Sequence, residues 1–374
     1  MLTFSRTDTS VVGRWWWTVD RWTLIAVGLL IAIGGVLTLA ASPAVAERIG
    51  LDQFHFVHRQ VLFLMPALAL MFAISLMPPL WIRRLSAVGL AGSFALMALT
   101  LVVGSEIKGA HRWLYIAGLS LQPSEFVKPC FAVVSGWMFA EQRRNEGFPG
   151  NLCAIVLFAA VAAVLLMQPD VGMTLVISVV WFAQFFVAGL PMVLVGFGGV
   201  IGVVGLGAAY SLLPHVASRI DRFLDPAGGD NYQIERAMQA FQAGGLFGRG
   251  PGEGSVKSVL PDAHTDFIFA VAGEEFGLFL CLLIICLFAF VVLRGYSRML
   301  AENNFFIMLA GTGLLTQLGL QAVINIGVNL RLMPTKGMTL PFISYGGSSL
   351  LALAIGMGML LALTRSRPSL GGNL

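Results

Sequence analysis

The sequence predicts an all-α polytopic membrane protein with about ten transmembrane helices. Hydrophobic residues make up 57% of the 374 residues and charged residues only 11%, whereas about 25% of the residues in soluble proteins are charged. Ten segments approach the length of about 20 apolar residues that a membrane-spanning helix needs. Lipid is therefore expected to surround most of the chain. The expected spans are residues 23–41, 59–78, 86–104, 124–141, 151–167, 171–188, 191–213, 267–293, 304–327 and 346–364.

Arginines in the short loops predict the orientation of the chain. Pairs of arginines follow the second, fourth, eighth and tenth spans, and three further arginines precede the first span. Loops with such a positive excess stay in the cytoplasm, so both termini are expected there. The predicted organisation is a cytoplasmic N-terminal tail (1–22), one transmembrane domain (23–364) and a cytoplasmic C-terminal tail (365–374).

The large loop 214–266, between the seventh and eighth spans, is expected on the outer side. It is far longer than the usual connection of about 4–6 residues. Ile234, Met238 and Phe241 recur at i, i+4 and i+7, which predicts an amphipathic helix on the membrane surface. A glycine-rich run at 244–257 follows. Its backbone amides would suit a phosphate, or its glycines would simply make the loop flexible.

Cysteine placement and net charge exclude two classes of function. All four cysteines lie within apolar stretches, so neither a disulfide framework nor a cysteine metal site is expected. The net charge of +4 is spread over many loops, so no nucleic-acid partner is expected.

Charged residues at the ends of predicted spans are candidates for function, because a charge is costly in lipid. Glu125 and Lys128 stand three residues apart after a proline that suits the first turn of a helix. They are either a self-satisfied ion pair or part of a substrate pathway. Asp170 opens the sixth span, where it would cap the helix or belong to the same pathway.

The segment His264-Thr265-Asp266 leads into the eighth span. Thr265 or Asp266 would serve as a helix cap or as a functional group. Glu274 and Glu275 lie deeper in the span and need cationic partners, for which Lys128 is a candidate. These residue types also occur in metal sites, but their spacing matches no standard metal motif.

The outward loop after the third span holds Gly109-Ala-His-Arg112-Trp113. Arg112 would bind an anion, and Trp113 would stack on a sugar face. The alternative is an aromatic residue at the membrane interface beside an arginine that contacts lipid headgroups.

Five motifs together resemble those of the SEDS (shape, elongation, division and sporulation) family of bacteria, over nearly the whole chain. The final motif looks like that of the division member of the family, and it contains Lys336, Ser344 and Tyr345, which are expected to bind substrate. The motifs are Gly-Ala-x-Arg-Trp at 109–113, Gln-Pro-Ser-Glu-x-x-Lys at 122–128, Gln-Pro-Asp-x-Gly at 168–172, His-Thr-Asp-Phe-Ile-Phe at 264–269 and Pro-Thr-Lys-Gly-Met-Thr-Leu-Pro-Phe-Ile-Ser-Tyr-Gly-Gly-Ser-Ser at 334–349.

The resemblance implies a peptidoglycan glycosyltransferase that polymerises lipid II, a disaccharide-pentapeptide on undecaprenyl pyrophosphate, into glycan strands. It implies a place in the bacterial inner membrane at the division septum. The implied partners are a division-specific class B penicillin-binding protein (FtsI) and other divisome membrane proteins. The catalytic acidic residue of the family corresponds to Asp266, and its central polar cavity corresponds to Glu125, Lys128 and Asp170.

The implied reaction is a single displacement with inversion at an anomeric carbon. A carboxylate has to take the proton of the attacking hydroxyl, and Asp266 is expected to be that base, with His264 orienting it or the acceptor. The leaving pyrophosphate needs positive charge, and Mg²⁺ or Mn²⁺ would serve the same end. The sequence leaves this choice open. The outward cations available are Arg112, Lys128, Arg249, Lys257 and Lys336.

Two other classes of function fit part of the pattern. A lipid II flippase or another transporter would also place a polar cavity among interrupted helices. A scaffold without chemistry would leave several charges inside the membrane without a purpose. The clustering of charges toward the outer face favours the polymerase.

Overall fold

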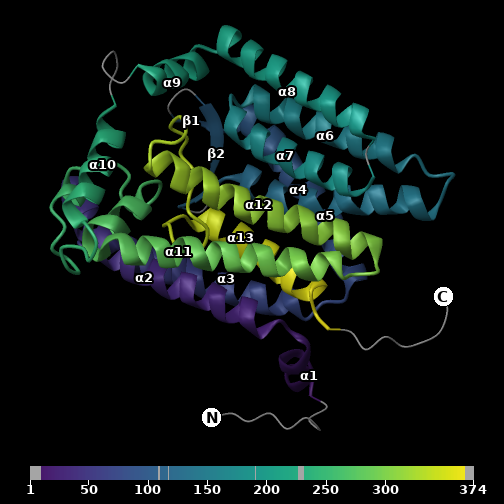
Figure 1. The fold of residues 1–374 in the computed structure, drawn as a ribbon, viewed down its shortest axis with the longest axis horizontal. Coiled ribbons are helices and arrows are strands. Elements are labelled where there is room, and N and C mark those ends of the chain that lie inside the picture. The colour runs from purple at the N-terminus through teal and green to yellow at the C-terminus, as the bar shows by residue number, and fades with distance from the viewer. Residues whose placement is uncertain (1–9, 108–109, 117, 190, 226–230, 367–374) are drawn as a thin grey trace.

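A computed structural model describes residues 10–366 apart from 108–109, 117, 190 and 226–230. The outermost parts of both predicted tails, Gly109 of the first motif and part of the large loop lie outside the described residues. The chain folds as a bundle of mostly antiparallel helices, with the large loop gathered at one end (Figure 1).

A helix covers each of the ten segments predicted to span a membrane. Proline at the first position begins α4 and α5, as expected from its fixed φ and missing N–H. The helices are α2 (Arg21–Arg48), α3 (His55–Ser75), α4 (Pro79–Val103), α5 (Pro123–Arg144), α6 (Gly150–Met167), α7 (Val171–Val187), α8 (Met192–Leu212), α11 (Ile268–Leu300), α12 (Phe305–Asn329) and α13 (Gly347–Leu363).

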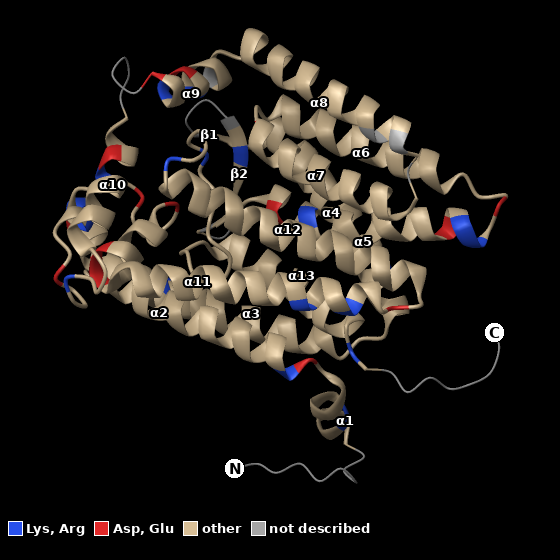
Figure 2. Cartoon of the chain, viewed as in Figure 1, with Lys and Arg blue, Asp and Glu red and all other residues tan. Residues whose placement is uncertain are grey.

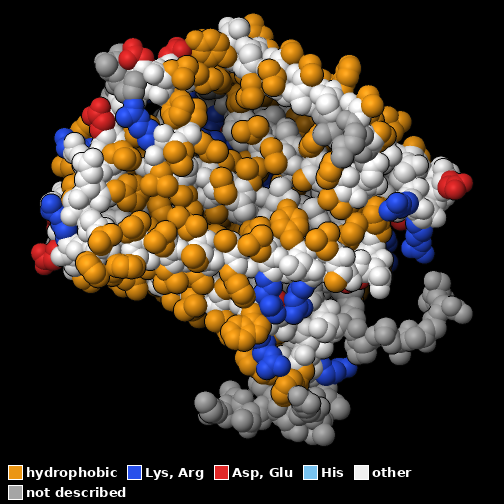
Figure 3. Space-filling model, in the orientation of Figure 1, with side chains coloured by type: hydrophobic (Ala, Val, Ile, Leu, Met, Phe, Trp, Pro, Cys, Tyr) orange, Lys and Arg blue, Asp and Glu red, His pale blue; other side chains and the backbone are white. Residues whose placement is uncertain are grey.

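Six of these helices are long and apolar enough to cross a membrane. The number is seven if α8 and α9 (Pro214–Leu224), which meet at 99°, form one bent span. The helices α7 and α13 are apolar but have only 17 residues each. Hydrophobic side chains cover much of the visible surface (Figure 3). The chain is thus built as a multi-pass membrane protein, and the number of ten spans stays a prediction.

The centre of the bundle consists of α5, α12 and α13, in each of which more than half of the residues are buried. Close approach of these helices uses small residues. A side chain at Gly136 of α5 would meet the backbone of Ala310 of α12 at 2.9 Å. By contrast, α8 contains no buried residue among those described, and its apolar side chains face outward. The polar ends of α5, α12 and α13 therefore meet inside the protein, where they can form a site.

The all-α prediction is wrong for the loop between α4 and α5. This loop forms a three-stranded antiparallel sheet of β1 (Ser105–Ile107), β2 (Ala110–Ile116) and β3 (Leu119–Leu121). Along β2, Leu114 is buried and Tyr115 is exposed, which is the alternation of a strand with one covered face. The sheet is what holds Arg112 and Trp113 in place.

The amphipathic helix predicted in the large loop is present as α10 (Tyr232–Gly244), and its place on the membrane surface stays a prediction. Its apolar face packs against α11: Ile234 is buried, and the rings of Phe241 and Phe269 lie 5.8 Å apart. The helix is therefore part of the protein core at this end of the bundle.

The glycine-rich run is neither a phosphate cradle nor a loose segment. It pairs with a break in α11, where Gly277 adopts a φ of 75°. The amides of Arg249 and Gly250 donate to the carbonyls of Glu274 and Glu275, both at 3.0 Å. A side chain at Gly248 would come within 2.1 Å of the Glu275 carbonyl oxygen. The glycines are thus needed for close backbone contact.

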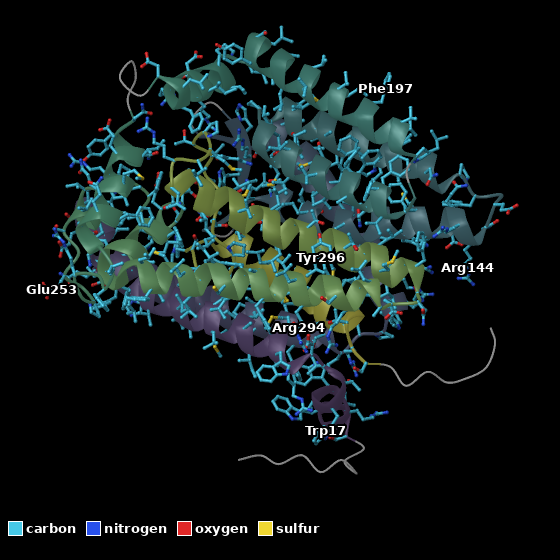
Figure 4. The ribbon with its side chains drawn as sticks, in the orientation of Figure 1. Trp17, Arg144, Phe197, Glu253, Arg294 and Tyr296 are labelled. Atoms are coloured by element: carbon cyan, nitrogen blue, oxygen red, sulfur yellow. The ribbon has the colours of Figure 1, made fainter. Side chains whose placement is uncertain are left out.

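The charged residues gather mainly at the ends of the helices (Figure 2). Glu253 of the glycine-rich run and Arg144 at the end of α5 lie at opposite ends of the molecule (Figure 4). Short helix α1 (Val11–Thr18) joins the end that holds Arg144, and Asp20 after it pairs there with Arg294 and Arg298 at 2.8 and 3.0 Å. We call this the arginine-rich end; it contains Arg83, Arg84, Arg143, Arg144, Arg294, Arg298 and Arg365.

Candidate functional site

A cavity of about 320 Å³ lies at the end of the bundle opposite the arginine-rich end. The first turns of α5, α7 and α13, strand β2, the turn before α11 and the segment between α12 and α13 form its walls. It therefore collects residues from all five sequence motifs. The predicted site residues that line it are Arg112, Trp113, Glu125, Asp170, Asp266, Lys336 and Tyr345.

Asp266 stands half-buried in the turn immediately before α11. Its backbone carbonyl accepts hydrogen bonds from the side chains of Asn325 and Asn329 of α12, both at 2.9 Å. The preceding carbonyl of Thr265 accepts a hydrogen bond from Ser344 at 2.6 Å. The residue at the cap position of α11 is Phe267, which makes no side-chain cap. Helix capping therefore does not explain Asp266 or Thr265.

Gly337 lies directly against the Asp266 carboxylate. A Cβ at this position would come within 2.7 Å of Asp266 Oδ2, so only glycine leaves the carboxylate where it is. The Gly337→Ala variant is expected to remain folded but to lose activity by about 10²-fold, because small misplacement of a reacting group has effects of that size. The measurement is glycan polymerisation alongside thermal unfolding. Gly207→Ala is the matched control, because nothing lies within 4 Å of a Cβ there; equal activity in the two variants would contradict the prediction.

Asp170 joins two cations from distant segments. Its carboxylate lies 3.4 Å from Arg112 Nη1 and 3.4 Å from Lys336 Nζ, and it also caps α7 by accepting from the amide of Met173 at 3.0 Å. Burial alone would raise the pKa of Asp170, but the two cations and this amide hold it below its ordinary value. Capping and participation in the polar cavity are thus both present. Gly172 leaves room for the Lys336 stem, since a Cβ there would lie 2.0 Å from Lys336 Cδ.

Glu125 and Lys128 form the predicted ion pair on one face of α5, at 3.0 Å. Only Glu125 reaches the cavity wall; Lys128 is behind it and also donates to Gln321 of α12 at 3.0 Å. Glu125 Oε2 and Lys336 Nζ have ion-pair partners, yet neither makes a hydrogen bond within the described part of the chain. Both atoms therefore have hydrogen-bonding capacity left for a ligand.

Comparison with known proteins shows the family to which the chain belongs. The family described as “Cell cycle protein”, which comprises FtsW, RodA and SpoVE, matches residues 21–368. The chain belongs to the FtsW/RodA/SpoVE family. The resemblance to the SEDS family noted from the motifs is confirmed.

Relatives within the family are similar over nearly their whole length. A protein of Caulobacter vibrioides named “Probable peptidoglycan glycosyltransferase FtsW” is 50% identical over 371 residues, which cover 99% of this chain and 95% of that protein. The protein of the same name from Legionella pneumophila is 35% identical, covering 91% of this chain and 90% of its own length.

Two solved structures share the fold. One, titled “Structural coordination of polymerization and crosslinking by a peptidoglycan synthase complex”, has a TM-score of 0.76 and 31% identity, covering 92% of this chain and 97% of that chain. The other, RodA of Thermus thermophilus, has a TM-score of 0.68 and 29% identity, covering 93% and 97%. The fold described above is therefore that of the FtsW/RodA/SpoVE family.

Besides Lys128, three site residues predicted from the family motifs and the large loop lie outside the cavity wall. Lys257 is buried, forms an ion pair with Glu275, and donates to the carbonyl of Ala40 at 3.0 Å. Ser344 supports the turn at Thr265, and its Oγ also accepts from the amide of Leu340. His264 lies behind Tyr345.

Lys128, the candidate partner for the carboxylates of α11, pairs with Glu125 instead. Lys257 pairs with Glu275, while Glu274 accepts from the backbone amides of Val256 and Lys257 at 2.6 and 2.9 Å. These two carboxylates therefore fix the glycine-rich run and the one-turn 3-10 helix at Val256–Ser258.

The His264 ring lies between aromatic rings, 4.1 Å from the centroid of Phe56 and 5.4 Å from that of Tyr345. Burial lowers the pKa of His264 from 6.5 to about 4. The unfolded chain therefore binds a proton below pH 6.5, whereas the folded protein binds it only near pH 4. The contribution of His264 to the free energy of unfolding is therefore fully present above pH 6.5. It falls by up to about 3 kcal/mol as the pH drops toward 4.

The His264→Gln variant is expected to lose less stability between pH 7 and pH 4 than the unmodified protein. The measurement is the thermal unfolding midpoint in detergent at several pH values in this range. Parallel curves for the two proteins would show that His264 does not carry the effect.

Several cavity residues were not predicted from the sequence. Arg59 of α3 and Thr339 line the cavity, and Arg219 of α9 interacts electrostatically with both Arg112 and Asp170. Arg59 had a visible signal, because it is a charged residue at the edge of an apolar segment. The approach of Arg219 depends on the course of the large loop and had no such signal.

The residues of the cavity do not form a metal site by themselves. Among the described residues, no group of three or more His, Cys, Asp or Glu side chains is arranged to hold a metal ion. Glu125 and Asp170 are already paired with cations. A Mg²⁺ or Mn²⁺ ion would therefore need phosphate oxygens of a bound ligand to complete its coordination.

Proposed function

We propose that this chain is a peptidoglycan glycosyltransferase that polymerises lipid II into glycan strands for the septal wall of dividing bacteria. The observation that carries the proposal is the half-buried Asp266 in a cavity with cations at its wall, Lys336 and Arg112. The relatives named as probable peptidoglycan glycosyltransferases support the reaction class.

Asp266 acts as the general base of this reaction. The 4-hydroxyl of the GlcNAc of one lipid II molecule attacks the anomeric carbon of the MurNAc at the end of the growing strand. Asp266 takes the hydroxyl proton as the new C–O bond forms, which is worth typically 10²–10⁴-fold in rate. The donor bond is α and the product bond is β, so one in-line displacement accounts for the inversion without a covalent enzyme intermediate.

The bond from the anomeric carbon to the pyrophosphate breaks in the same step, and its electron pair leaves with undecaprenyl pyrophosphate. Negative charge then grows on the phosphate oxygens. Lys336 and Arg112, held near each other by Asp170, neutralise that charge from fixed positions. Trp113, at the cavity wall, offers an aromatic face for a sugar ring.

The tail of lipid II stays in the membrane, so the reaction takes place at a bilayer surface. We place the cavity at the outer surface of a ten-span protein whose termini are both cytoplasmic, because the arginine-rich end is the opposite end. A cysteine at Glu253 should react with an impermeant maleimide in intact cells, and one at Arg144 only after permeabilisation, in a background without native cysteines. The reverse pattern would overturn this orientation.

The partner is proposed to be a division-specific class B penicillin-binding protein, acting with other divisome proteins at the septum. The support is the similar structure whose title joins polymerisation and crosslinking in one peptidoglycan synthase complex. Polymerisation is expected to be faster with the partner than without it. Equal rates would remove the partner from the proposal while leaving the reaction itself untouched.

Purified protein and lipid II in detergent provide the test of the function. A polymerase makes glycan strands there, whereas a flippase has no compartments to work between. Polymer formation supports the proposal. Absence of polymer, together with movement of lipid II across vesicles that contain the protein, would replace it with the transport function.

A further inference from the structure

A second cavity, of about 490 Å³, lies at the arginine-rich end, far from the site at Asp266. It opens between the beginning of α4, the last turns of α5 and the beginning of α12. Its wall includes Arg83, Trp137, Glu141, Arg144 and Phe305. None of these residues has a part in the proposed polymerisation.

Two arginines give this cavity its charge. Among the described residues, neither Arg83 nor Arg144 forms an ion pair. The Arg83 guanidinium lies 4.7 Å from the ring centroid of Trp137, and Trp137 Nε1 donates to Glu141 at 3.2 Å. The carboxylate of Glu141 accepts this hydrogen bond but keeps its charge, so two guanidinium groups against one carboxylate leave the cavity with a net positive charge.

Apart from Asn304, the remaining wall is apolar and continues onto a surface suited to lipid. Leu80 of the wall is 45% exposed, and its neighbour Trp81 is 54% exposed. Phe305 and Phe306 complete the apolar side. A free anion would use the guanidinium groups alone, and an acidic peptide would leave the apolar side uncovered. A phospholipid matches both parts, because its phosphate would meet the arginines and its acyl chains would follow α4.

We propose that this cavity binds the headgroup of an anionic phospholipid, with Arg83 and Arg144 donating hydrogen bonds to its phosphate. Guanidinium groups bind phosphate in a bidentate way and are weakly hydrated. This lipid site shares no residue with the polymerase site, so the proposal does not depend on the proposed polymerase function.

The test measures lipid retention on the delipidated, full-length protein in detergent by native mass spectrometry. The probes are phosphatidylglycerol and phosphatidylcholine, with inorganic phosphate and a polyglutamate peptide as competitors. Phosphatidylglycerol is expected to bind more tightly than phosphatidylcholine, and the double variant Arg83→Gln with Arg144→Gln is expected to bind it about 30-fold more weakly. Arg144→Gln alone, at an exposed position, should weaken binding by about fivefold without a risk to folding.

The matched control is Arg21→Gln with Arg84→Gln, which removes the same charge from the same end. Arg21 and Arg84 lie over the rings of Trp17 and Trp81 and do not line the cavity, so phosphatidylglycerol binding should stay within about twofold. Equal loss in both double variants, or equal binding of the two lipids, would overturn the proposal. So would displacement of the lipid by an equal concentration of inorganic phosphate or of a polyglutamate peptide, which would indicate a site for a free anion or an acidic protein segment.

Discussion

The Asp266→Asn variant is expected to lose glycan polymerisation by about 10²–10⁴-fold, the usual contribution of a general base. Asparagine has the same shape but cannot take the hydroxyl proton. The backbone carbonyl at this position would keep its hydrogen bonds from Asn325 and Asn329, so the turn before α11 should remain intact. The measurement is the initial rate of polymer formation from lipid II by purified protein with its transpeptidase partner.

Asp262→Asn is the control for this substitution. Asp262 lies in the same turn, has a φ of 53° and does not line the cavity. Asparagine tolerates that backbone conformation, so activity should stay within about twofold. Unfolding midpoints close to that of the unmodified protein are expected for both variants. Substantial activity in Asp266→Asn, or an equal loss in Asp262→Asn, would remove Asp266 from the role of base.

The Lys336→Met variant is expected to show the second-largest effect, a loss of about 10²–10³-fold in turnover. Methionine keeps the apolar stem that fits beside Gly172 but removes the charge that meets the leaving pyrophosphate. Asp170 would lose its ion pair with Lys336 and keep the one with Arg112. The measurement is turnover at saturating lipid II, which separates loss of catalysis from loss of binding.

Arg249→Gln tests whether any outward cation could stabilise the leaving pyrophosphate. Arg249 is exposed on the glycine-rich run, where it donates to the carbonyl of Ala243 and to Ser255. It does not line the cavity, so turnover should stay within about twofold. If Arg249→Gln lost as much turnover as Lys336→Met, the charge of the whole loop, and not the cavity cation, would support the reaction.

Helix positions and part of the membership of the cavity could be predicted from local sequence. Long apolar segments locate the helices because lipid requires them, and motif residues such as Glu125 and Asp170 lie at helix starts that point to one end of the bundle. Arginines in the short loops marked the opposite end. These features depend on residues close together in the chain.

Contacts between distant segments could not be predicted in the same way. Lys257 looked like a substrate cation, but the pairing of the glycine-rich run with the break at Gly277 brings it to Glu275. The ion pair between Arg112 and Asp170 is likewise non-local, because the two residues belong to separate motifs. The sequence does not distinguish Gly337 from the other glycines, and only the structure shows that it lies against the Asp266 carboxylate.

Binding of lipid II in this cavity is the claim on which the account depends, and site-specific photocrosslinking tests it most directly. The photoreactive residue p-benzoylphenylalanine would replace Tyr345, an aromatic residue of the cavity wall, or Tyr296, which lies on α11 near its arginine-rich end. We expect labelled lipid II to be captured at position 345 and not at position 296. Capture at 296 alone, or equal capture at both positions, would contradict a substrate site at Asp266.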